Sequence, residues 1–206
     1  MNIDSILTTL AEKEPGIMGL ENFRRSAVLI PLVERNSETH ILFEVRSLNM
    51  RRQPGDICFP GGRIDSNDPT PQACAIRETV EELGISNQSI SDVTPIDYVV
   101  SDMGRIIYPF VGRIPDVKKI MPNESEVGEV FTVPLSHFQQ TKPDSYKVNF
   151  KVIPEEDFPF NLIVGGENYN WQIRHMEELF YRYEDRVIWG LTAKILQHFL
   201  TLISDK

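Results

Sequence analysis

A glycine-containing turn that leads into an acidic helix constrains this chain more than any other feature of its sequence. The short apolar segment at residues 57–59 runs through a proline into Gly61 and Gly62, and a helical pattern at residues 70–83 ends at Gly84. Glycine lets the backbone turn sharply and approach other groups closely, and a glycine directly after a helix is typical of a helix end. The sequence therefore predicts a strand, a tight turn and a helix in close succession.

Further strands and helices are predicted around this unit. Residues 26–33 and 40–45 are rich in branched apolar side chains and are expected to form a β-hairpin. The other strand candidates and the last helix lie at residues 95–100, 106–114, 127–133, 146–153 and 188–203. Residues 154–170 are rich in Pro, Gly and Asn and are expected to form a loop. Strands with helices before, between and after them favour a mixed β-sheet flanked by helices.

The length of the chain predicts a single domain. It has 206 residues, of which 41% are hydrophobic, which suits one domain with a substantial core. We therefore expect one domain over residues 1–206. Apolar residues recur at helical spacing between Ile3 and Leu10, before Pro15 and Gly16. This pattern predicts a short amphipathic helix over about residues 1–16, which packs on the domain as an appendage.

The acidic composition argues against several classes of protein. A net charge of −9 and a pI near 5.0 make the surface repel polyanions, so no nucleic-acid partner is expected. The sequence shows neither the basic start of a signal peptide nor an apolar run of roughly 18 residues, which predicts a cytoplasmic protein with no membrane association. Cys58 and Cys74 lack a metal or redox spacing and are expected to be reduced core thiols.

The predicted helix at residues 70–83 carries three glutamates and one arginine on adjacent turns. These residues are Arg77, Glu78, Glu81 and Glu82. At about 100° per residue, the stripe expected to face the core consists of Ala73, Ile76, Val80 and Leu83. The glutamates are expected on the opposite side. Taken alone, three glutamates on one helix are more typical of a solvated face than of a metal site.

The upstream glycines change that interpretation. A turn at Gly61 and Gly62 can bring backbone carbonyl oxygens beside the helix carboxylates. Magnesium prefers such oxygen ligands and retains several of its waters. Cations held there would bridge a diphosphate, neutralise charge on a leaving group and activate a water molecule. The combination therefore indicates hydrolysis of a phosphoanhydride bond.

Residues 62–85 also resemble a known family motif. The segment reads GRIDSNDPTPQACAIRETVEELGI and resembles the Nudix box, G-x5-E-x7-R-E-U-x-E-E-x-G-U, where U is apolar. Asp68 stands at the position of the early glutamate, eight residues rather than seven separate it from Arg77, and Thr79 replaces an apolar residue. The resemblance implies a Nudix hydrolase with an α/β/α sandwich built on a mixed sheet. It assigns no role to Asp68.

A second segment narrows the resemblance to one branch of this family. Residues 42–62 read LFEVRSLNMRRQPGDICFPGG and look like the coenzyme A pyrophosphatase pattern L-L-x-x-R-S-x-x-[LM]-R-x-x-x-G-x-x-x-F-P-G-G. The resemblance implies that the substrate is coenzyme A or an acyl derivative. Cleavage of its pyrophosphate bond would give adenosine 3',5'-bisphosphate and 4'-phosphopantetheine, or the acylated form.

The resemblance also implies roles for individual residues. The expected ligands for Mg²⁺ or Mn²⁺ are Glu78, Glu81, Glu82 and the carbonyl of Gly62. The expected catalytic residues are Glu78, Arg77, which orients the carboxylates, and Glu126. The arginines expected to bind the 3'-phosphate of the substrate are Arg46, Arg51, Arg52 and Arg63.

Several alternatives stay open at this point. Glu124 and Glu129 compete with Glu78 and Glu126 as the general base. The substrate could instead be ADP-ribose, a dinucleotide or a nucleoside triphosphate, and the chain could be a non-catalytic module that binds nucleotides. The sequence does not choose between free and acylated coenzyme A, between Mg²⁺ and Mn²⁺, or between a monomer and a homodimer.

Overall fold

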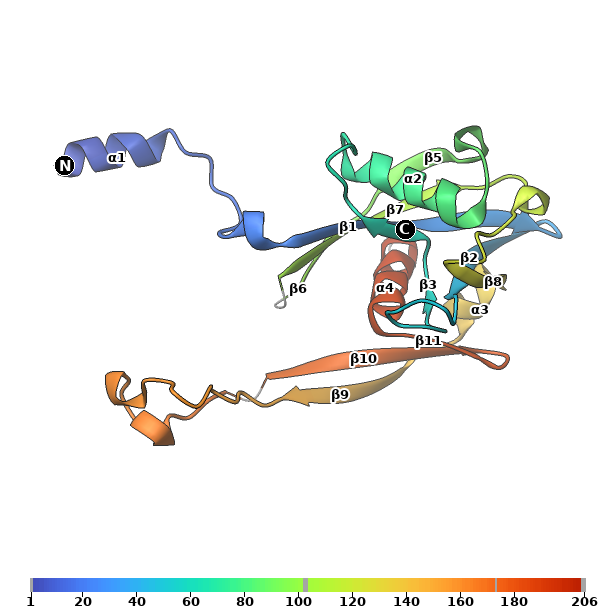
Figure 1. The fold of residues 1–206 in the computed structure, drawn as a ribbon. Helices are drawn as coiled ribbons and strands as arrows, with labels where there is room; N and C mark the ends of the chain where they lie inside the picture. Colours follow the sequence, from blue (N-terminus) through green and yellow to red (C-terminus); the bar gives the residue numbers. More distant parts are fainter. Residues whose placement is uncertain (1, 102–103, 173, 205–206) are drawn as a thin grey trace.

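A mixed β-sheet with helices against both faces forms the body of the computed structural model, which describes residues 2–101, 104–172 and 174–204 (Figure 1). The strands are β1 (Arg24–Arg35), β2 (Glu38–Arg46), β3 (Ile57–Cys58), β4 (Gly61–Arg63), β5 (Ser91–Pro95), β6 (Val99–Ser101), β7 (Arg105–Arg113), β8 (Val127–Pro134), β9 (Asp144–Phe150), β10 (Arg174–Tyr183) and β11 (Arg186–Trp189). The α-helices are α1 (Ile3–Ala11), α2 (Pro71–Leu83), α3 (Leu135–Gln140) and α4 (Gly190–Ser204).

Strand pairing makes this sheet mixed. In the described residues, β3, β2, β1, β7 and β5 follow one another across the sheet, while β4 pairs with β1, β6 with β7 and β8 with β2. β1 and β7 run parallel, whereas the β1–β2 and β2–β8 pairs are antiparallel. β9, β10 and β11 form a separate antiparallel sheet. The predicted helix-flanked mixed sheet is therefore confirmed.

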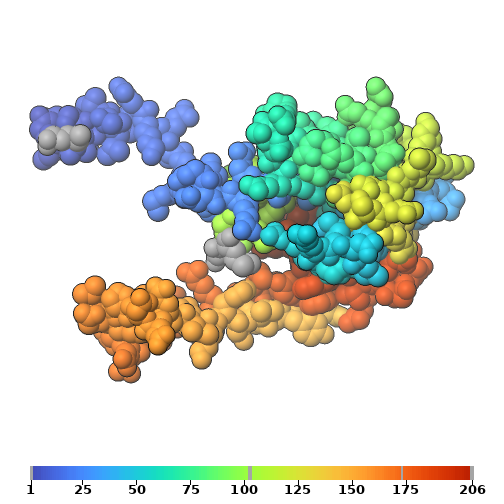
Figure 2. Space-filling model, in the orientation of Figure 1, coloured from blue at the N-terminus to red at the C-terminus, as the bar shows by residue number. Residues whose placement is uncertain are grey.

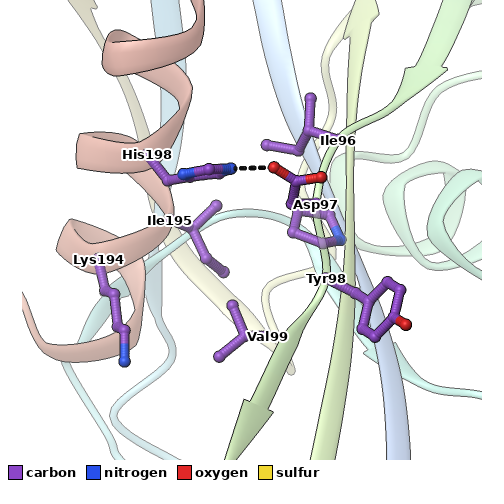
Figure 3. Close-up of a pocket in the computed structure, with 8 residues that line it drawn as sticks. Ile96, Asp97, Tyr98, Val99, Lys194, Ile195 and His198 are labelled. Carbon is purple, nitrogen blue, oxygen red and sulfur yellow. Dashed lines mark hydrogen bonds and ion pairs between the residues drawn. The ribbon is translucent and has the colours of Figure 1, made fainter.

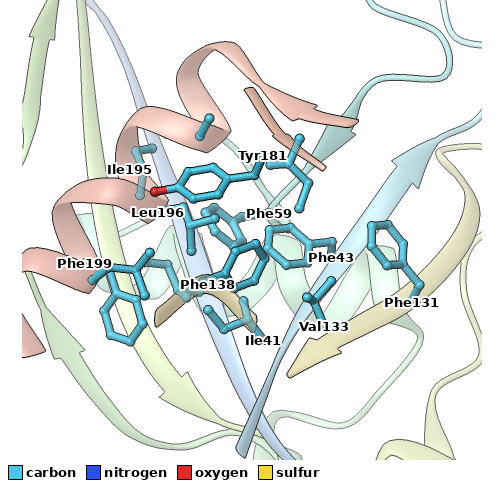
Figure 4. Packing of buried hydrophobic residues seen from close by; sticks show 14 of the residues in the cluster. Ile41, Phe43, Phe59, Phe131, Val133, Phe138, Tyr181, Ile195, Leu196 and Phe199 are labelled. Carbon is cyan, nitrogen blue, oxygen red and sulfur yellow. The ribbon is translucent and has the colours of Figure 1, made fainter. Parts of the chain in front are cut away.

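Apolar side chains fill both sides of the sheet, because successive residues of a strand point to opposite faces. On one side, Phe43 stacks on Phe59 and Phe131, with ring centroids 5.0 and 5.6 Å apart. Helix α4 covers this cluster with Leu196 and Phe199 (Figure 4). On the other side, residues of β1 and β2 pack against α2. Helix α2 thus covers one face of the sheet, and α4, α3 and the second sheet cover the other.

Residues 57–63 lie between two strands that separate from each other. β1 and β2 pair directly only near their turn, at residues 32–35 and 38–41. Farther along, β3 pairs with β2 and β4 pairs with β1. The turn expected at Gly61 and Gly62 is therefore corrected to a short strand, because their backbone completes the hydrogen bonding of β1. β3 and β4 thus lie between β2 and β1, and the two glycines lie within the sheet rather than at its edge.

Several predicted boundaries need correction. The hairpin at residues 26–33 and 40–45 is confirmed, as are the α2 helix and the loop at residues 154–170. The single strand predicted at residues 95–100 is wrong: β5 ends at Pro95, which has no N–H to extend the ladder, and β6 begins at Val99. The last helix begins at Gly190, because Ile188 pairs with Tyr181 in the second sheet. No strand was expected at β10.

Two segments extend away from the body (Figures 1 and 2). The predicted N-terminal helix is present as α1, whereas Met1 lies outside the described residues. The expectation that it packs is wrong, since Ile3, Leu7 and Leu10 are 73%, 59% and 59% exposed. The second extension consists of β9, β10 and the loop that connects them. Within the described ranges, no helix combines the length and apolar composition needed to cross a membrane.

Candidate active site

Helix α2 is held firmly at both ends. The Thr70 hydroxyl accepts the N–H of Ala73 at 3.1 Å, which caps the first turn. At the other end, the loop at residues 121–126 donates backbone N–H groups to the carbonyls of Glu82 and Leu83, both at 2.9 Å. Gly84 adopts φ = 60°, and a Cβ there would lie 1.9 Å from the carbonyl oxygen of Met121. The helix and the loop are therefore fixed relative to each other.

The buried face of α2 differs from the predicted stripe. Its buried residues are Cys74, Ala75, Thr79, Glu82 and Leu83. The stripe expected from Ala73, Ile76 and Val80 is wrong except for Leu83, and Glu82 is only 5% exposed rather than on the opposite side. The hydropathy pattern did not predict this face because two of its buried residues are polar and hydrogen-bonded. The Thr79 hydroxyl donates to the Ala75 carbonyl at 2.7 Å, and the Glu82 carboxylate accepts the Gly61 N–H.

The two glycines of β4 let the glutamates of α2 approach the sheet. The N–H of Gly61 donates to Glu82 Oε2 at 2.7 Å. A Cβ on Gly62 would lie 2.3 Å from the carboxyl carbon of Glu78, so this side chain lies directly against the backbone. Gly61 has φ = 153°, and its Cβ would lie 2.4 Å from the Ala27 carbonyl. Only glycine fits both positions without displacing a neighbour.

Arg77 connects the acidic residues of the helix. Its Nε and Nη2 donate to the two oxygens of Asp68 at 2.9 and 2.8 Å, a bidentate pair. Its Nη1 lies 2.9 Å from Glu78 Oε1 and 3.1 Å from Glu81 Oε2. The Arg77 hydrogen bonds lower the pKa of Asp68 well below its usual range. Asp68, which had no role from sequence, therefore anchors the arginine that orients Glu78.

A fourth buried carboxylate comes from the sheet. Glu44 on β2 is 1% exposed, and its Oε1 accepts a hydrogen bond from the Cys58 thiol at 3.2 Å. Burial raises the pKa of Glu44 to about 7, and burial followed by the charge of Glu44 raises the pKa of Glu82 to about 9. Glu44 was not among the residues expected at the site, although a charged residue inside the apolar run ILFEV indicates an unusual position.

Glu126 belongs to the same group of charges, whereas Glu129 does not. The charge of Glu126 acts on Glu44, Glu78 and Glu82. Glu129 lies on the other face of the sheet, where it pairs with Arg186 at 2.5 Å. We refer to Glu44, Glu78, Glu82 and Glu126 as the glutamate cluster. Glu124 is exposed, and Glu81 is 53% exposed at the rim of the helix.

The glutamate cluster suits a divalent cation by its chemistry. Within the described residues, no three His, Cys, Asp or Glu side chains form a ready-made ligand set, because Glu78 turns to Arg77 and Glu82 to Gly61. The donors are nevertheless the hard oxygens that Mg²⁺ prefers. Glu44 Oε2 is buried with no hydrogen-bond partner, and buried carboxylates require compensation by positive charge. The carbonyl oxygen of Gly62, the remaining expected ligand, accepts a hydrogen bond from the Cys74 thiol at 3.8 Å.

The arginines of the predicted substrate site lie on both sides of β3 and β4. Arg46 is partly buried at the end of β2, where its Nε donates to the carbonyl of Arg52 at 3.3 Å. Arg51 and Arg52 are exposed on the loop between β2 and β3, and Arg63 is exposed at the end of β4. The structure therefore places Arg51 and Arg52 on this loop, Arg46 at the end of the strand that leads into it, and Arg63 directly after the glycines.

Two surface hollows lie away from the glutamate cluster. One, of about 190 Å³, lies between α4 and residues 96–99, with a His198–Asp97 contact of 2.9 Å at its edge (Figure 3). The other, of about 800 Å³, lies near the β1–β2 turn and Arg113. Neither is lined by a carboxylate of the glutamate cluster. The chemistry of the acidic residues, rather than the depth of a hollow, therefore locates the candidate site.

Comparison with known proteins agrees with this geometry. The family model for the NUDIX domain matches residues 23–155. The chain belongs to the Nudix family. This Nudix hydrolase is 30% identical over 198 residues to the Nudix hydrolase NudL of Citrobacter koseri, covering 96% of this chain and 92% of that protein. It is 29% identical over 186 residues to Nudix hydrolase 3 of Caenorhabditis elegans, covering 86% and 72%.

Two further matches concern a relative with a named activity and a solved structure. The chain is 38% identical over 112 residues to the peroxisomal coenzyme A diphosphatase NUDT7 of Mus musculus, covering 54% of this chain and only 48% of that protein. A MutT/nudix family protein from Enterococcus faecalis has a similar structure, with a TM-score of 0.52, 15% identity, and coverage of 100% and 71%. The structural match shows the shared fold alone.

Proposed function

We propose that this Nudix hydrolase cleaves the pyrophosphate bond of coenzyme A or acyl-coenzyme A with the help of Mg²⁺ or Mn²⁺. The observation that carries the proposal is the glutamate cluster, of which Glu82 and Glu78 lie against Gly61 and Gly62 and in which buried carboxylates require positive charge. Family membership supports pyrophosphate hydrolysis and the use of a divalent cation. The segment at residues 42–62 and the partial match to NUDT7 support coenzyme A as the substrate.

The chain's own residues have distinct roles in this proposal. The cation would be held by Glu78, Glu81, Glu82 and the carbonyl of Gly62. When bound, it would act as a Lewis acid that neutralises charge on the phosphates. Arg77, anchored by Asp68, orients Glu78 and Glu81. Water attacks one phosphorus, the bridging P–O bond breaks, and the water's proton passes to a carboxylate. We assign this role to Glu126, a carboxylate outside the helix whose charge acts on Glu78 and Glu82.

Arginine recognition of the 3'-phosphate gives a test of the substrate. We expect dephospho-coenzyme A, which lacks this phosphate, to react with a kcat/KM about 10-fold or more below that of coenzyme A, since a lost charge-assisted hydrogen bond costs about 1.5–3 kcal/mol. Steady-state kinetics on both compounds measures the ratio, and ADP-ribose serves as the competing substrate. Equal values for coenzyme A and its dephospho form, or a clear preference for ADP-ribose, would refute coenzyme A specificity.

The two glutamates near the start of β8 give a matched pair of variants. Glu126→Gln should lower kcat by about 100-fold, the usual contribution of a general base. Glu129→Gln should leave kcat within about twofold, since Glu129 faces Arg186 on the opposite side of the sheet. Single-turnover rates with saturating Mg²⁺ measure both effects. A larger loss in Glu129→Gln than in Glu126→Gln would reverse the assignment of the base.

A further inference from the structure

Glu44 is unusual among the described residues because it is a carboxylate buried within the sheet. Its side chain is 1% exposed, one oxygen accepts the Cys58 thiol at 3.2 Å, and Oε2 has no hydrogen-bond partner. Burying an ionised carboxylate costs several kcal/mol unless charge and hydrogen bonds compensate it. Buried charges in proteins are accordingly paired or coordinate metals. The unpartnered oxygen therefore indicates a partner that the protein chain does not supply.

The alternation of β2 sets the direction of this side chain. Leu42 packs with Leu83 on the α2 side of the sheet, whereas Phe43 packs on the α4 side. Glu44 follows Leu42 by two residues and so points to the α2 side. The charges that act on Glu44 are those of Arg46, Glu126 and Glu78, and the charge of Glu44 acts in turn on Glu82. Glu44 thus points from the sheet towards the glutamates of the helix.

We propose that Glu44 contributes a carboxylate from the sheet to the divalent-cation site, a role that rests on the metal dependence proposed above. Cys58 lies opposite Glu44 in the β2–β3 pair, and its thiol donates a hydrogen bond to Glu44 Oε1. Cys58 is therefore a positioning residue that leaves Oε2 available to the cation. The extra negative charge strengthens cation binding, at the cost of repulsion between carboxylates when no cation is bound.

Direct measurement of cation binding tests this role without any substrate. Isothermal titration calorimetry with MnCl₂ should show that Glu44→Gln binds Mn²⁺ about 10-fold or more weakly than the wild type. Without metal, Glu44→Gln should be at least as stable towards urea as the wild type, because the substitution removes a buried like charge. Glu44→Met, which has a similar length and no polar oxygen, is a second variant in which the same loss of affinity is expected.

The control is Glu177→Gln, which neutralises an exposed glutamate on β10 and should bind Mn²⁺ as the wild type does. Unchanged Mn²⁺ affinity in both Glu44 variants would overturn the role of Glu44 and would leave the proposed function standing. A wild-type protein that binds no Mn²⁺ would overturn the proposed cation site as well. These two failures are therefore distinguishable in one titration series.

Discussion

Glu82→Gln should lower metal-dependent turnover by at least about 100-fold while the protein stays folded. Glu82 is 5% exposed and lies where the α2 helix meets β4, so its charge is the most deeply buried of those on the helix. Glutamine has nearly the same shape and keeps an oxygen that can accept the Gly61 N–H. The substitution therefore removes the charge and preserves the contact. Steady-state kinetics over a range of Mg²⁺ concentrations measures the loss.

The stability of Glu82→Gln separates chemistry from folding. In the absence of metal, its urea midpoint should equal or exceed that of the wild type, because burial and the charge of Glu44 both disfavour an ionised Glu82. Glu177→Gln is the control for loss of one negative charge. Activity close to that of the wild type in Glu82→Gln would contradict the assignment of this residue to the cation site.

Gly61→Ala should destabilise the fold by about 4 kcal/mol or more. The new Cβ would lie 2.4 Å from the Ala27 carbonyl oxygen and 2.6 Å from the Val28 Cα, and both of these atoms belong to the backbone of β1. β1 cannot move away easily, since its residues 24–32 pair with residues 105–113 of β7. The positive φ of Gly61 adds strain for any residue with a side chain. Urea unfolding of the purified protein measures the change.

Gly16→Ala is the matched control for this substitution. A Cβ at Gly16 meets no atom within 4 Å, so its effect should stay within about 0.5 kcal/mol. Gly62→Ala offers a useful contrast, because its Cβ would displace the carboxylate of Glu78 rather than backbone. It should therefore fold better than Gly61→Ala and still lose activity. A Gly61→Ala protein as stable as the wild type would show that β1 and β4 separate more easily than their pairing indicates.

Much of the fold could be predicted because its pattern is local. The β1–β2 hairpin follows from two branched apolar segments, and α2 follows from its cap at Thr70 and the glycine at its end. The strand at Gly61 and Gly62 could not be predicted in this way. Its formation depends on the separation of β1 and β2, which no short window of sequence records. The β10 strand, which pairs with the adjacent β11 and with the more distant β9, was also missed.

The sequence named several residues of the candidate site, but it did not indicate how they are buried or paired. Spacing and resemblance name Glu78, Glu81 and Glu82 as candidates, but the orientation of the helix was predicted wrongly, because hydropathy places the buried Glu82 at the surface. Glu44 was overlooked since the residues around it read as an ordinary core strand. Asp68 required the structure, because its partner Arg77 lies on the following helix. Burial of polar residues depends on partners that only the folded chain provides.

A product-resolved assay of coenzyme A hydrolysis with and without a chelator tests the central proposal most directly. With Mg²⁺, the protein should convert coenzyme A to adenosine 3',5'-bisphosphate and 4'-phosphopantetheine in equal amounts, because one phosphoanhydride bond is broken per turnover. Excess EDTA should abolish both products, and restored Mg²⁺ or Mn²⁺ should recover them. Turnover that persists in EDTA, or no product from coenzyme A at micromolar enzyme with either metal, would contradict metal-dependent coenzyme A hydrolysis at the glutamate cluster.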